Sequence, residues 1–132
     1  MKKSLIYTLV LSTLSLLGCR DNEESTANKL VGTWKLTEAK ISNGGSSTWT
    51  TISNGYTIKI KSDNTYETTQ IPDCNTGTYS IDNNNVIKFV NSCGNTTIPS
   101  SYKIVSIENR TLILNGTFCT EDCNEKFQKI AN

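Results

Sequence analysis

Cysteine is the residue type with the most chemical potential in this 132-residue chain, which has five cysteines and no histidine. Cys74, Cys93, Cys119 and Cys123 are an even number, and four cysteines can form two disulfides in three ways. Only the last two come close to the spacing of a zinc-binding pair, and the Cys-x-x-Cys pattern of a redox dithiol is absent. We therefore predict disulfides and no metal site.

An Asp-Asn-Asn-Asn turn predicts which cysteines pair. If Asn83 and Asn84 are the two central turn residues, residues whose numbers sum to 167 face each other, and Cys74 then faces Cys93. Directly opposed cysteines lie within bridging distance, although a bulge near Gly77 would shift this register. We predict the disulfide Cys74–Cys93, which leaves Cys119–Cys123 to close the turn before the last strand.

The absence of histidine excludes most catalytic chemistry. Ser-His-Asp and Cys-His systems, histidine metal sites and the usual general base near neutral pH all need that residue. The sequence also has no phosphate-binding glycine loop, no nucleotide fingerprint and no G-x-S-x-G motif. We expect no enzymatic activity and no cofactor; a carboxylate-only enzyme would need two buried carboxylates in one pocket. The available carboxylates are expected on turns or solvent-facing positions: Asp63, Glu67, Asp73 and Asp82.

The first residues have the pattern of an export signal. Lys2 and Lys3 precede a mainly apolar run over 5–17, which is too short to span a bilayer. The run ends in Leu16-Leu17-Gly18-Cys19, which resembles the lipobox of bacterial lipoproteins in all four positions. We predict a signal peptide over 1–18 and a diacylglycerol thioether on Cys19 that anchors the protein to a membrane. The alternatives are an ordinary signal peptide with a chance cysteine, or an uncleaved anchor.

Residues 20–28 are polar without periodicity and predict a tether that follows the lipidated Cys19. Their acidic cluster resembles the export signals of surface lipoproteins in the Bacteroidetes group, although a solvated linker would look similar. Arg20 stands where enterobacterial lipoproteins retained in the inner membrane have Asp. We expect an outer-membrane, lipid-anchored protein exposed at the cell surface.

The charge balance of the mature chain disfavours one class of partner. Of the 13 Lys and Arg residues, Lys2 and Lys3 lie in the signal peptide, which leaves 11 basic against 12 acidic residues. No basic surface remains to hold a polyanion, so we expect no nucleic-acid partner.

Residues 29–132 predict a single all-β domain. Turn residues recur every 8–12 positions, and 56–61 alternates between apolar and polar side chains as a half-buried strand does. Residues 49–54 are ambiguous, and no long amphipathic helix is expected. The eight expected strands are 30–41, 56–61, 65–71, 78–81, 86–90, 102–107, 111–116 and 124–130.

The segment Leu30-Val31-Gly32-Thr33-Trp34 places Gly-x-Trp at the start of the first expected strand. Together with eight strands in a lipoprotein, this resembles the lipocalin-like domain of bacterial lipoproteins, over residues 29–132. The resemblance implies an antiparallel up-and-down barrel in which Gly32 turns the chain and Trp34 closes the floor against a basic side chain. The family normally has an arginine there, whereas this chain offers Lys126, Lys129 or Arg110, and it lacks the Thr-Asp-Tyr motif of long lipocalins.

An eight-stranded barrel is wide enough for its own side chains or for one small ligand. Trp49, in a Gly/Ser-rich loop expected over the open end, is a candidate ligand contact. We expect noncatalytic binding of a small, partly apolar molecule. The alternative is a surface module with a solid interior that contacts a protein or glycan; no protein partner can be named. The candidate interior residues, which could equally be core, are Tyr56, Ile58, Tyr66 and Phe89.

Overall fold

The computed structural model describes residues 24–42 and 44–132. The expected signal peptide, the lipobox with Cys19 and the tether as far as residue 23 lie outside the described residues. The described chain forms one short helix and nine strands: α1 (Thr26–Leu30), β1 (Gly32–Ile41), β2 (Thr50–Thr51), β3 (Thr57–Ile60), β4 (Thr65–Thr68), β5 (Thr76–Ile81), β6 (Val86–Cys93), β7 (Thr96–Glu108), β8 (Thr111–Gly116) and β9 (Cys123–Ala131).

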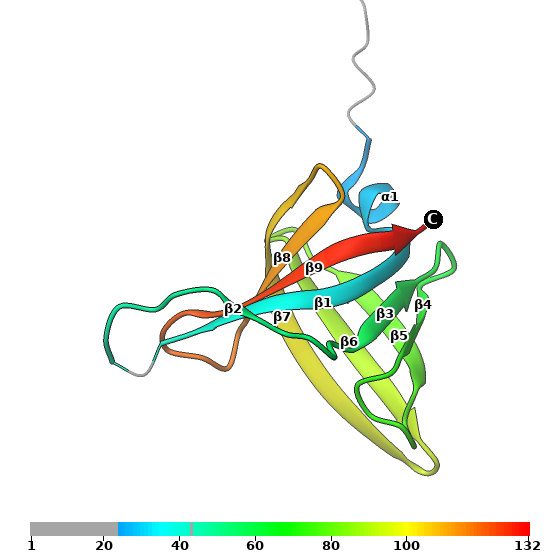
Figure 1. The fold of residues 1–132 in the computed structure, drawn as a ribbon. Helices are drawn as coiled ribbons and strands as arrows, with labels where there is room; N and C mark the ends of the chain where they lie inside the picture. Colours follow the sequence, from blue (N-terminus) through cyan, green and yellow to red (C-terminus); the bar gives the residue numbers. More distant parts are fainter. Residues whose placement is uncertain (1–23, 43) are drawn as a thin grey trace, which may run out of the picture.

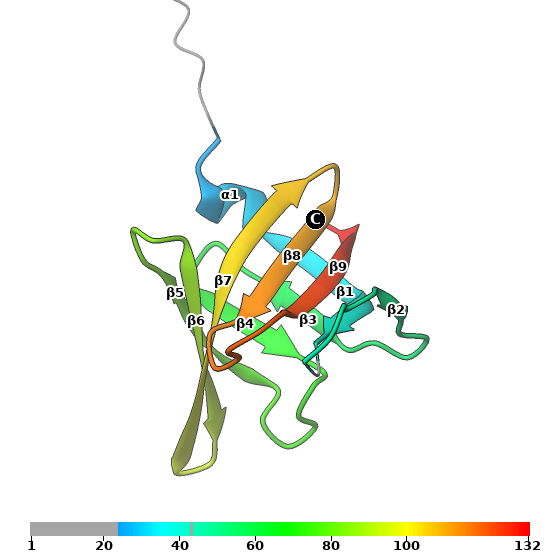
Figure 2. The same cartoon turned by 90° about the vertical axis from the view of Figure 1, so that its left-hand side faces the viewer.

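Eight of these strands close into an antiparallel barrel (Figures 1 and 2). From β3 to β9 each strand pairs with the next one along the chain, and β1 closes the barrel by pairing with both β3 and β9. The expected eight-stranded up-and-down barrel is thus confirmed. The ambiguous segment 49–54 contributes only β2, a two-residue strand that pairs with the end of β1.

Alternation of apolar and polar side chains explains why the sheet closes around one core. In β8, Leu112 and Leu114 are each 1% exposed, whereas the alternate residues Thr111, Ile113 and Asn115 are only partly buried. The barrel strands turn their apolar side chains inward, which removes from water the surface that a flat sheet would leave exposed. The core consists of Leu30, Trp34, Leu36, Ile58, Ile60, Tyr66, Tyr79, Ile87, Phe89, Ile104, Leu112, Leu114 and Phe127.

Helix α1 covers one end of the barrel and differs from the sequence expectation. Residues 26–28 were expected in the tether and Leu30 in the first strand, yet all of them are helical. The Ser25 side chain caps the helix by accepting a hydrogen bond from the Asn28 N–H. Leu30, fully buried, holds the last turn against the core, so burial of one leucine outweighs the polar character of the segment.

The hairpin between β5 and β6 has a register one residue away from the predicted one. Ile81 pairs with Ile87 rather than with Val86. The reason is that Asn85 has a φ of 58°, which adds a left-handed residue to one side of the turn. The side chain of Asp82 accepts hydrogen bonds from the Asn84 and Val86 N–H groups and holds this longer loop.

The disulfide Cys74–Cys93 is present despite this shift, with a Cα–Cα distance of 4.7 Å. Cys74 precedes β5, which begins at Thr76, so its position does not follow the ladder register. The predicted pairing was therefore right, although the register used to derive it was wrong.

Several strand ends also differ from the expectation, most of all in β7. This strand begins six residues earlier than expected, at Thr96, and with β6 it forms a hairpin that projects from the end of the barrel opposite α1 (Figure 1). The segment 96–101 has no clear apolar alternation, because most of it pairs only with β6 and lies outside the closed part of the barrel. By contrast, β4 ends at Thr68 rather than at residue 71.

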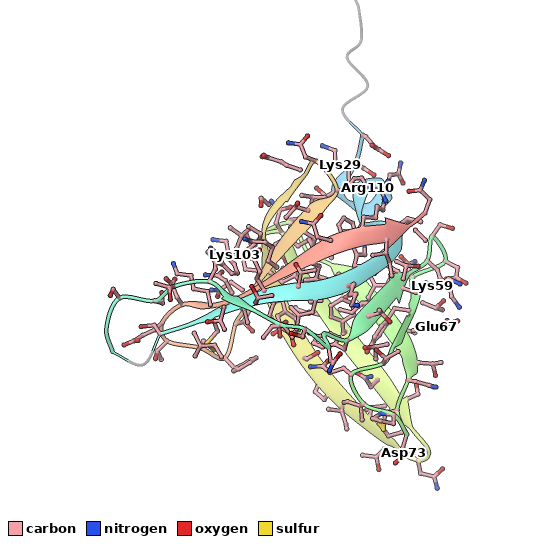
Figure 3. All side chains as sticks on the ribbon, in the orientation of Figure 1. Lys29, Lys59, Glu67, Asp73, Lys103 and Arg110 are labelled. Atoms are coloured by element: carbon pink, nitrogen blue, oxygen red, sulfur yellow. A yellow bond between two sulfur atoms is a disulfide. The ribbon has the colours of Figure 1, made fainter. Side chains whose placement is uncertain are left out.

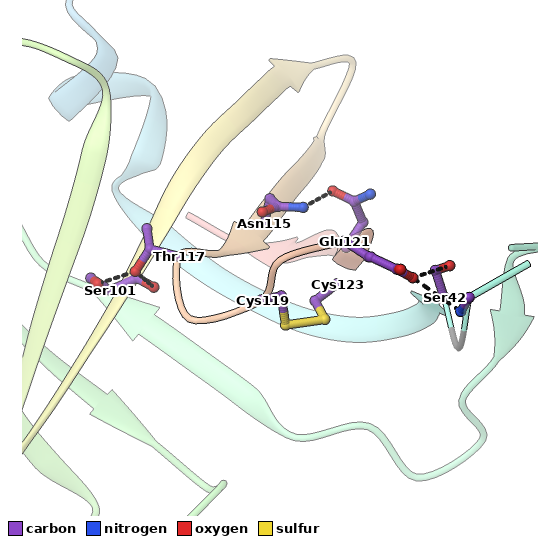
Figure 4. Close-up of a disulfide and its surroundings, with 9 residues drawn as sticks. Ser42, Ser101, Asn115, Thr117, Cys119, Glu121 and Cys123 are labelled. Carbon is purple, nitrogen blue, oxygen red and sulfur yellow. Dashed lines mark hydrogen bonds between the residues drawn. A yellow bond between two sulfur atoms is a disulfide. The ribbon is translucent and has the colours of Figure 1, made fainter.

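The second predicted disulfide, Cys119–Cys123, closes the loop between β8 and β9 (Figure 4). Hydrogen bonds tie this loop to the strands on both sides. Thr117 contacts Ser101 of β7, and the Glu121 carboxylate accepts a bond from the Ser42 hydroxyl after β1. In residues 24–42 and 44–132, no helix has the length and apolar character needed to cross a bilayer.

Candidate functional site

The two ends of the barrel differ in construction, and the end next to α1 is closed. Trp34 is 1% exposed, and its indole N–H donates a 2.7 Å hydrogen bond to the Leu30 carbonyl. The Lys129 ammonium lies 5.2 Å from the centre of the Trp34 ring, so Lys129 is the basic residue on the floor tryptophan. Arg110 instead donates to the Lys129 carbonyl, and Figure 3 shows Arg110 near Lys29 of α1.

Gly32 is required at this closed end. Its φ is 135°, and a side chain there would place Cβ 2.5 Å from the Lys129 Cε and 2.8 Å from the Ala131 carbonyl oxygen. The glycine therefore lets β1 start directly beneath the end of β9. Gly32 and Trp34 occupy the structural positions that the family resemblance implies for them.

The opposite end holds a small space inside the barrel wall. All four candidate interior residues, Tyr56, Ile58, Tyr66 and Phe89, line it. The cavity volume is about 10 Å³, room for roughly one water molecule. The interior is therefore filled almost completely by its own side chains. The other lining residues are Thr68, Gln70, Asn91, Ser100, Tyr102 and Leu114.

Four of the ten residues that line the cavity are aromatic, and their rings make edge-to-face contacts. The ring centroids of Tyr66 and Phe89 are 4.7 Å apart, and those of Phe89 and Tyr102 are 6.2 Å apart. Tyr56 packs in the same manner against Phe127, at 5.6 Å. Such pairs prefer this geometry because the positive edge of one ring meets the negative face of the next. The wall therefore presents both apolar ring faces and hydroxyl groups.

A buried hydrogen-bond chain connects this wall to the first disulfide. The Tyr66 hydroxyl donates to the Asn91 Oδ1, and the Asn91 Nδ2 donates to the Cys74 carbonyl at 2.7 Å. Burial raises the pKa of Tyr66 to about 12, so its hydroxyl stays neutral and available as a donor at physiological pH. Asn91, 6% exposed, has both amide atoms satisfied inside the barrel.

Glu125 adds a carboxylate to the inner face at the same end. Glu125 pairs with Leu114 of β8 and lies two residues before the core residue Phe127, so its side chain points inward. The Tyr56 hydroxyl donates a 2.9 Å hydrogen bond to the Glu125 Oε2. Burial raises the pKa of Glu125, and the bond from Tyr56 partly opposes this rise. Burial, and next the charge of Glu125, raise the pKa of Tyr56.

Sequence reasoning missed Tyr102 and Asn91, which line the cavity, and Glu125, which contacts the cavity residue Tyr56. The signal for Tyr102 and Glu125 was present, because Tyr102 alternates with buried Ile104 and Glu125 alternates with Phe127. Asn91 had no such signal, since the strand that contains it was expected to end at residue 90 and continues to Cys93.

Trp49 does not join this site. It was expected over the open end, but it is absent from the cavity wall, and its ring lies 4.2 Å from the Lys126 ammonium. Lys126 points outward between Glu125 and Phe127, and it pairs with Glu38. The tryptophan therefore packs on the outside of the barrel, because the loop folds back along β1 through β2. Its exposed fraction is 37%.

The four carboxylates considered for catalysis are separate and lie at turns or on the outer surface, where three are exposed and Asp82 is partly exposed. Asp63 accepts hydrogen bonds from Thr65, which lower its pKa, and Glu67 pairs with Lys61. Figure 3 shows Glu67 and Asp73 on the outside of the molecule. Within the part of the chain that the structure describes, no three His, Cys, Asp or Glu side chains are grouped so that they could hold a metal ion.

A closed up-and-down barrel with a tryptophan floor at one end and an aromatic-lined cavity at the other defines a calycin-like β-barrel protein. The chain belongs to the lipocalin-like domain family, whose model matches residues 30–114. The match covers the chain from the end of α1 into β8, and β9 completes the barrel beyond it. No curated protein and no solved structure matches the chain.

Proposed function

We propose that this protein is a noncatalytic, lipid-anchored binding module of the bacterial cell envelope, at the outer membrane and exposed at the cell surface. The lipobox-like sequence ending in Cys19 supports the anchor. The described chain begins beside α1, and the hairpin of β6 and β7 projects from the opposite end of the barrel (Figure 1). Asn91 and Ser100 of these two strands line the tyrosine-containing cavity. An anchor before α1 would therefore leave that end pointing away from the membrane.

The molecule that this module binds is, in our proposal, small and partly apolar. One observation carries this proposal: the aromatic and aliphatic side chains Tyr56, Ile58, Tyr66 and Phe89 converge on one cavity with polar groups at its rim. A volume of about 10 Å³ cannot hold an organic molecule, so binding requires side chains to move. Tyr102 is partly buried and Gln70 is exposed, and these two can move most readily.

Thermal unfolding of the purified protein with a panel of hydrophobic and glycan compounds tests this proposal. A ligand at a concentration 100 times its Kd stabilises the folded state by about 2.7 kcal/mol, which corresponds to a rise in Tm of several degrees. We expect the Tyr102→Ala variant to lose most of the shift and the Trp49→Ala variant, altered on the outer surface, to keep it. A panel that leaves Tm unchanged in the wild type contradicts ligand binding.

The second candidate function is a surface module that contacts protein or glycan without an internal ligand. The nearly filled interior favours it, as does the half-exposed ring of Trp49 on the outer face. Under this candidate, affinity capture of a partner fails for Trp49→Ala and persists for Tyr102→Ala. Trp49→Ala is thus the control variant for the first candidate function, and Tyr102→Ala is the control variant for the second.

A further inference from the structure

The carboxylate of Glu125 lies at the tyrosine-lined end without a positive partner. The ion pairs of the described residues are Lys40–Asp122, Lys61–Glu67, Lys88–Asp82 and Lys126–Glu38, and none of them includes Glu125. Its bond from the Tyr56 hydroxyl occupies Oε2. The hydrogen bonds of the described residues include none to the other oxygen, Oε1.

Folding of the barrel does not explain why this residue is charged. A neutral glutamine could accept the same bond from Tyr56 and would avoid the cost of removing a carboxylate from water. The neighbouring strand positions that face inward, Leu114 and Phe127, are apolar. A partly buried negative charge with one neutral donor is thus a cost to stability, and it becomes favourable when a cation binds next to it.

The surroundings of Glu125 are also suited to a cation. Tyr56 contacts the carboxylate through its hydroxyl, and Tyr102 lines the same cavity as Tyr56. Aromatic ring faces attract ammonium groups, most strongly where water is excluded. A carboxylate next to a cavity lined by tyrosine rings therefore selects a group that carries positive charge and apolar surface together.

We propose that the ligand of this end of the barrel carries a protonated amine beside its apolar part. Glu125 accepts a charge-assisted hydrogen bond from the ammonium group, and Tyr56 and Tyr102 contact the adjacent carbon atoms. This inference rests on the proposed small-molecule function and adds the chemical class of the ligand.

Two probes of similar shape, one charged and one neutral, separate the contribution of charge to affinity from that of apolar contact. Phenethylamine is protonated at pH 7, and phenethyl alcohol is its neutral counterpart. Binding of each is measured by isothermal titration calorimetry to the full-length chain in lipid nanodiscs, with empty nanodiscs subtracted. We expect the wild type to bind the amine about tenfold more tightly than the alcohol, as one charge-assisted hydrogen bond provides.

The Glu125→Gln variant should bring the two affinities to within about twofold of each other while leaving that of the alcohol unchanged. Glu121→Gln is the matched control, since it removes the same charge from an exposed loop outside the cavity and should keep the preference. Circular dichroism shows whether each variant is folded. If Glu125→Gln does not fold, the ratio of the wild type's affinities for the amine and the alcohol tests the inference. Glu125→Asp, which keeps the charge, should retain a preference for the amine.

Three results overturn the inference, and they are distinguishable. Equal affinity of the wild type for both probes contradicts the amine preference and leaves small-molecule binding intact. A preference for the amine that survives in Glu125→Gln shows that a group other than Glu125 binds the ammonium. No binding of either probe overturns the inference together with the small-molecule function on which it rests.

Discussion

The two tryptophans of this protein show how position decides the role of one residue type. Trp34 is 1% exposed, donates a hydrogen bond to Leu30 and lies under Lys129. Trp49 is 37% exposed and has Lys126 over its ring. Both contact a lysine of β9, but only Trp34 fills space in the core. Packing and burial, rather than the cation contact, should therefore determine their contributions to stability.

We expect Trp34→Ala to lower the free energy of unfolding by about 3–5 kcal/mol, because it empties a large part of the core and leaves the Leu30 carbonyl without its donor. Trp49→Ala, the matched control, should cost less than about 1 kcal/mol. Urea denaturation followed by circular dichroism measures both. Comparable losses for the two variants would mean that the contact with a lysine, which both tryptophans make, determines their contributions to stability instead of burial.

At the scale of elements, the two disulfides join different kinds of segment. Cys74–Cys93 spans 19 residues and fastens the segment before β5 to the end of β6. Cys119–Cys123 spans only four and closes the loop between β8 and β9. A longer closed loop restricts the unfolded chain more, so the first bridge should contribute more to stability.

On the chain-entropy model, removing Cys74–Cys93 should cost about 3 kcal/mol and removing Cys119–Cys123 about 2 kcal/mol. The paired variants are Cys74→Ala with Cys93→Ala, and Cys119→Ala with Cys123→Ala. Denaturant unfolding of both, beside the oxidised wild type, gives the two losses. The reverse order would show that native contacts of the loop after β8, and not loop length, dominate.

Strand β7 carries an unpaired edge in its first part. Most of 96–101 pairs with β6 alone, since β8 pairs with β7 only from Tyr102 onward, apart from the bonds of Thr117 to Ser101. Pro99 lies within this edge and has no N–H to offer a further strand. The proline therefore protects the projecting hairpin from edge-to-edge pairing with another chain.

The whole molecule is a barrel with one end closed by a helix and the other lined with tyrosines (Figure 2). If Cys19 is acylated, the residues between it and α1 connect the membrane to the closed end. The orientation of the proposed binding end then depends on the lipid anchor.

We expect Cys19→Ser to abolish incorporation of an alkyne-labelled palmitate and to move the protein out of the membrane fraction. The Cys119→Ala, Cys123→Ala pair is the control and should keep both label and membrane association, since these cysteines form a disulfide in the barrel. Labelling that persists in Cys19→Ser would place the lipid elsewhere. Membrane association that persists without label would indicate an uncleaved signal peptide as the anchor.

Sequence alone determined the features of this protein that depend on local pattern. Apolar alternation and turn residues predict the strands of the barrel, and the Gly-x-Trp of Gly32 and Trp34 predicts its first strand and floor. The disulfide pairing was also predicted, because Cys74 and Cys93 flank one hairpin and Cys119 and Cys123 flank the next loop, although the exact hairpin register was wrong. These signals are local: each depends on residues close together in the chain.

Tertiary structure alone decided which side chains meet. Trp49 packs on the outer face rather than over the cavity, and Lys129 rather than Arg110 covers Trp34, because barrel closure brings β9 against β1. The convergence of Tyr56 and Glu125, 69 residues apart, arises in the same way. Periodicity specifies the face on which a residue lies, but the volume left inside and the contacts across it depend on how all eight strands pack together.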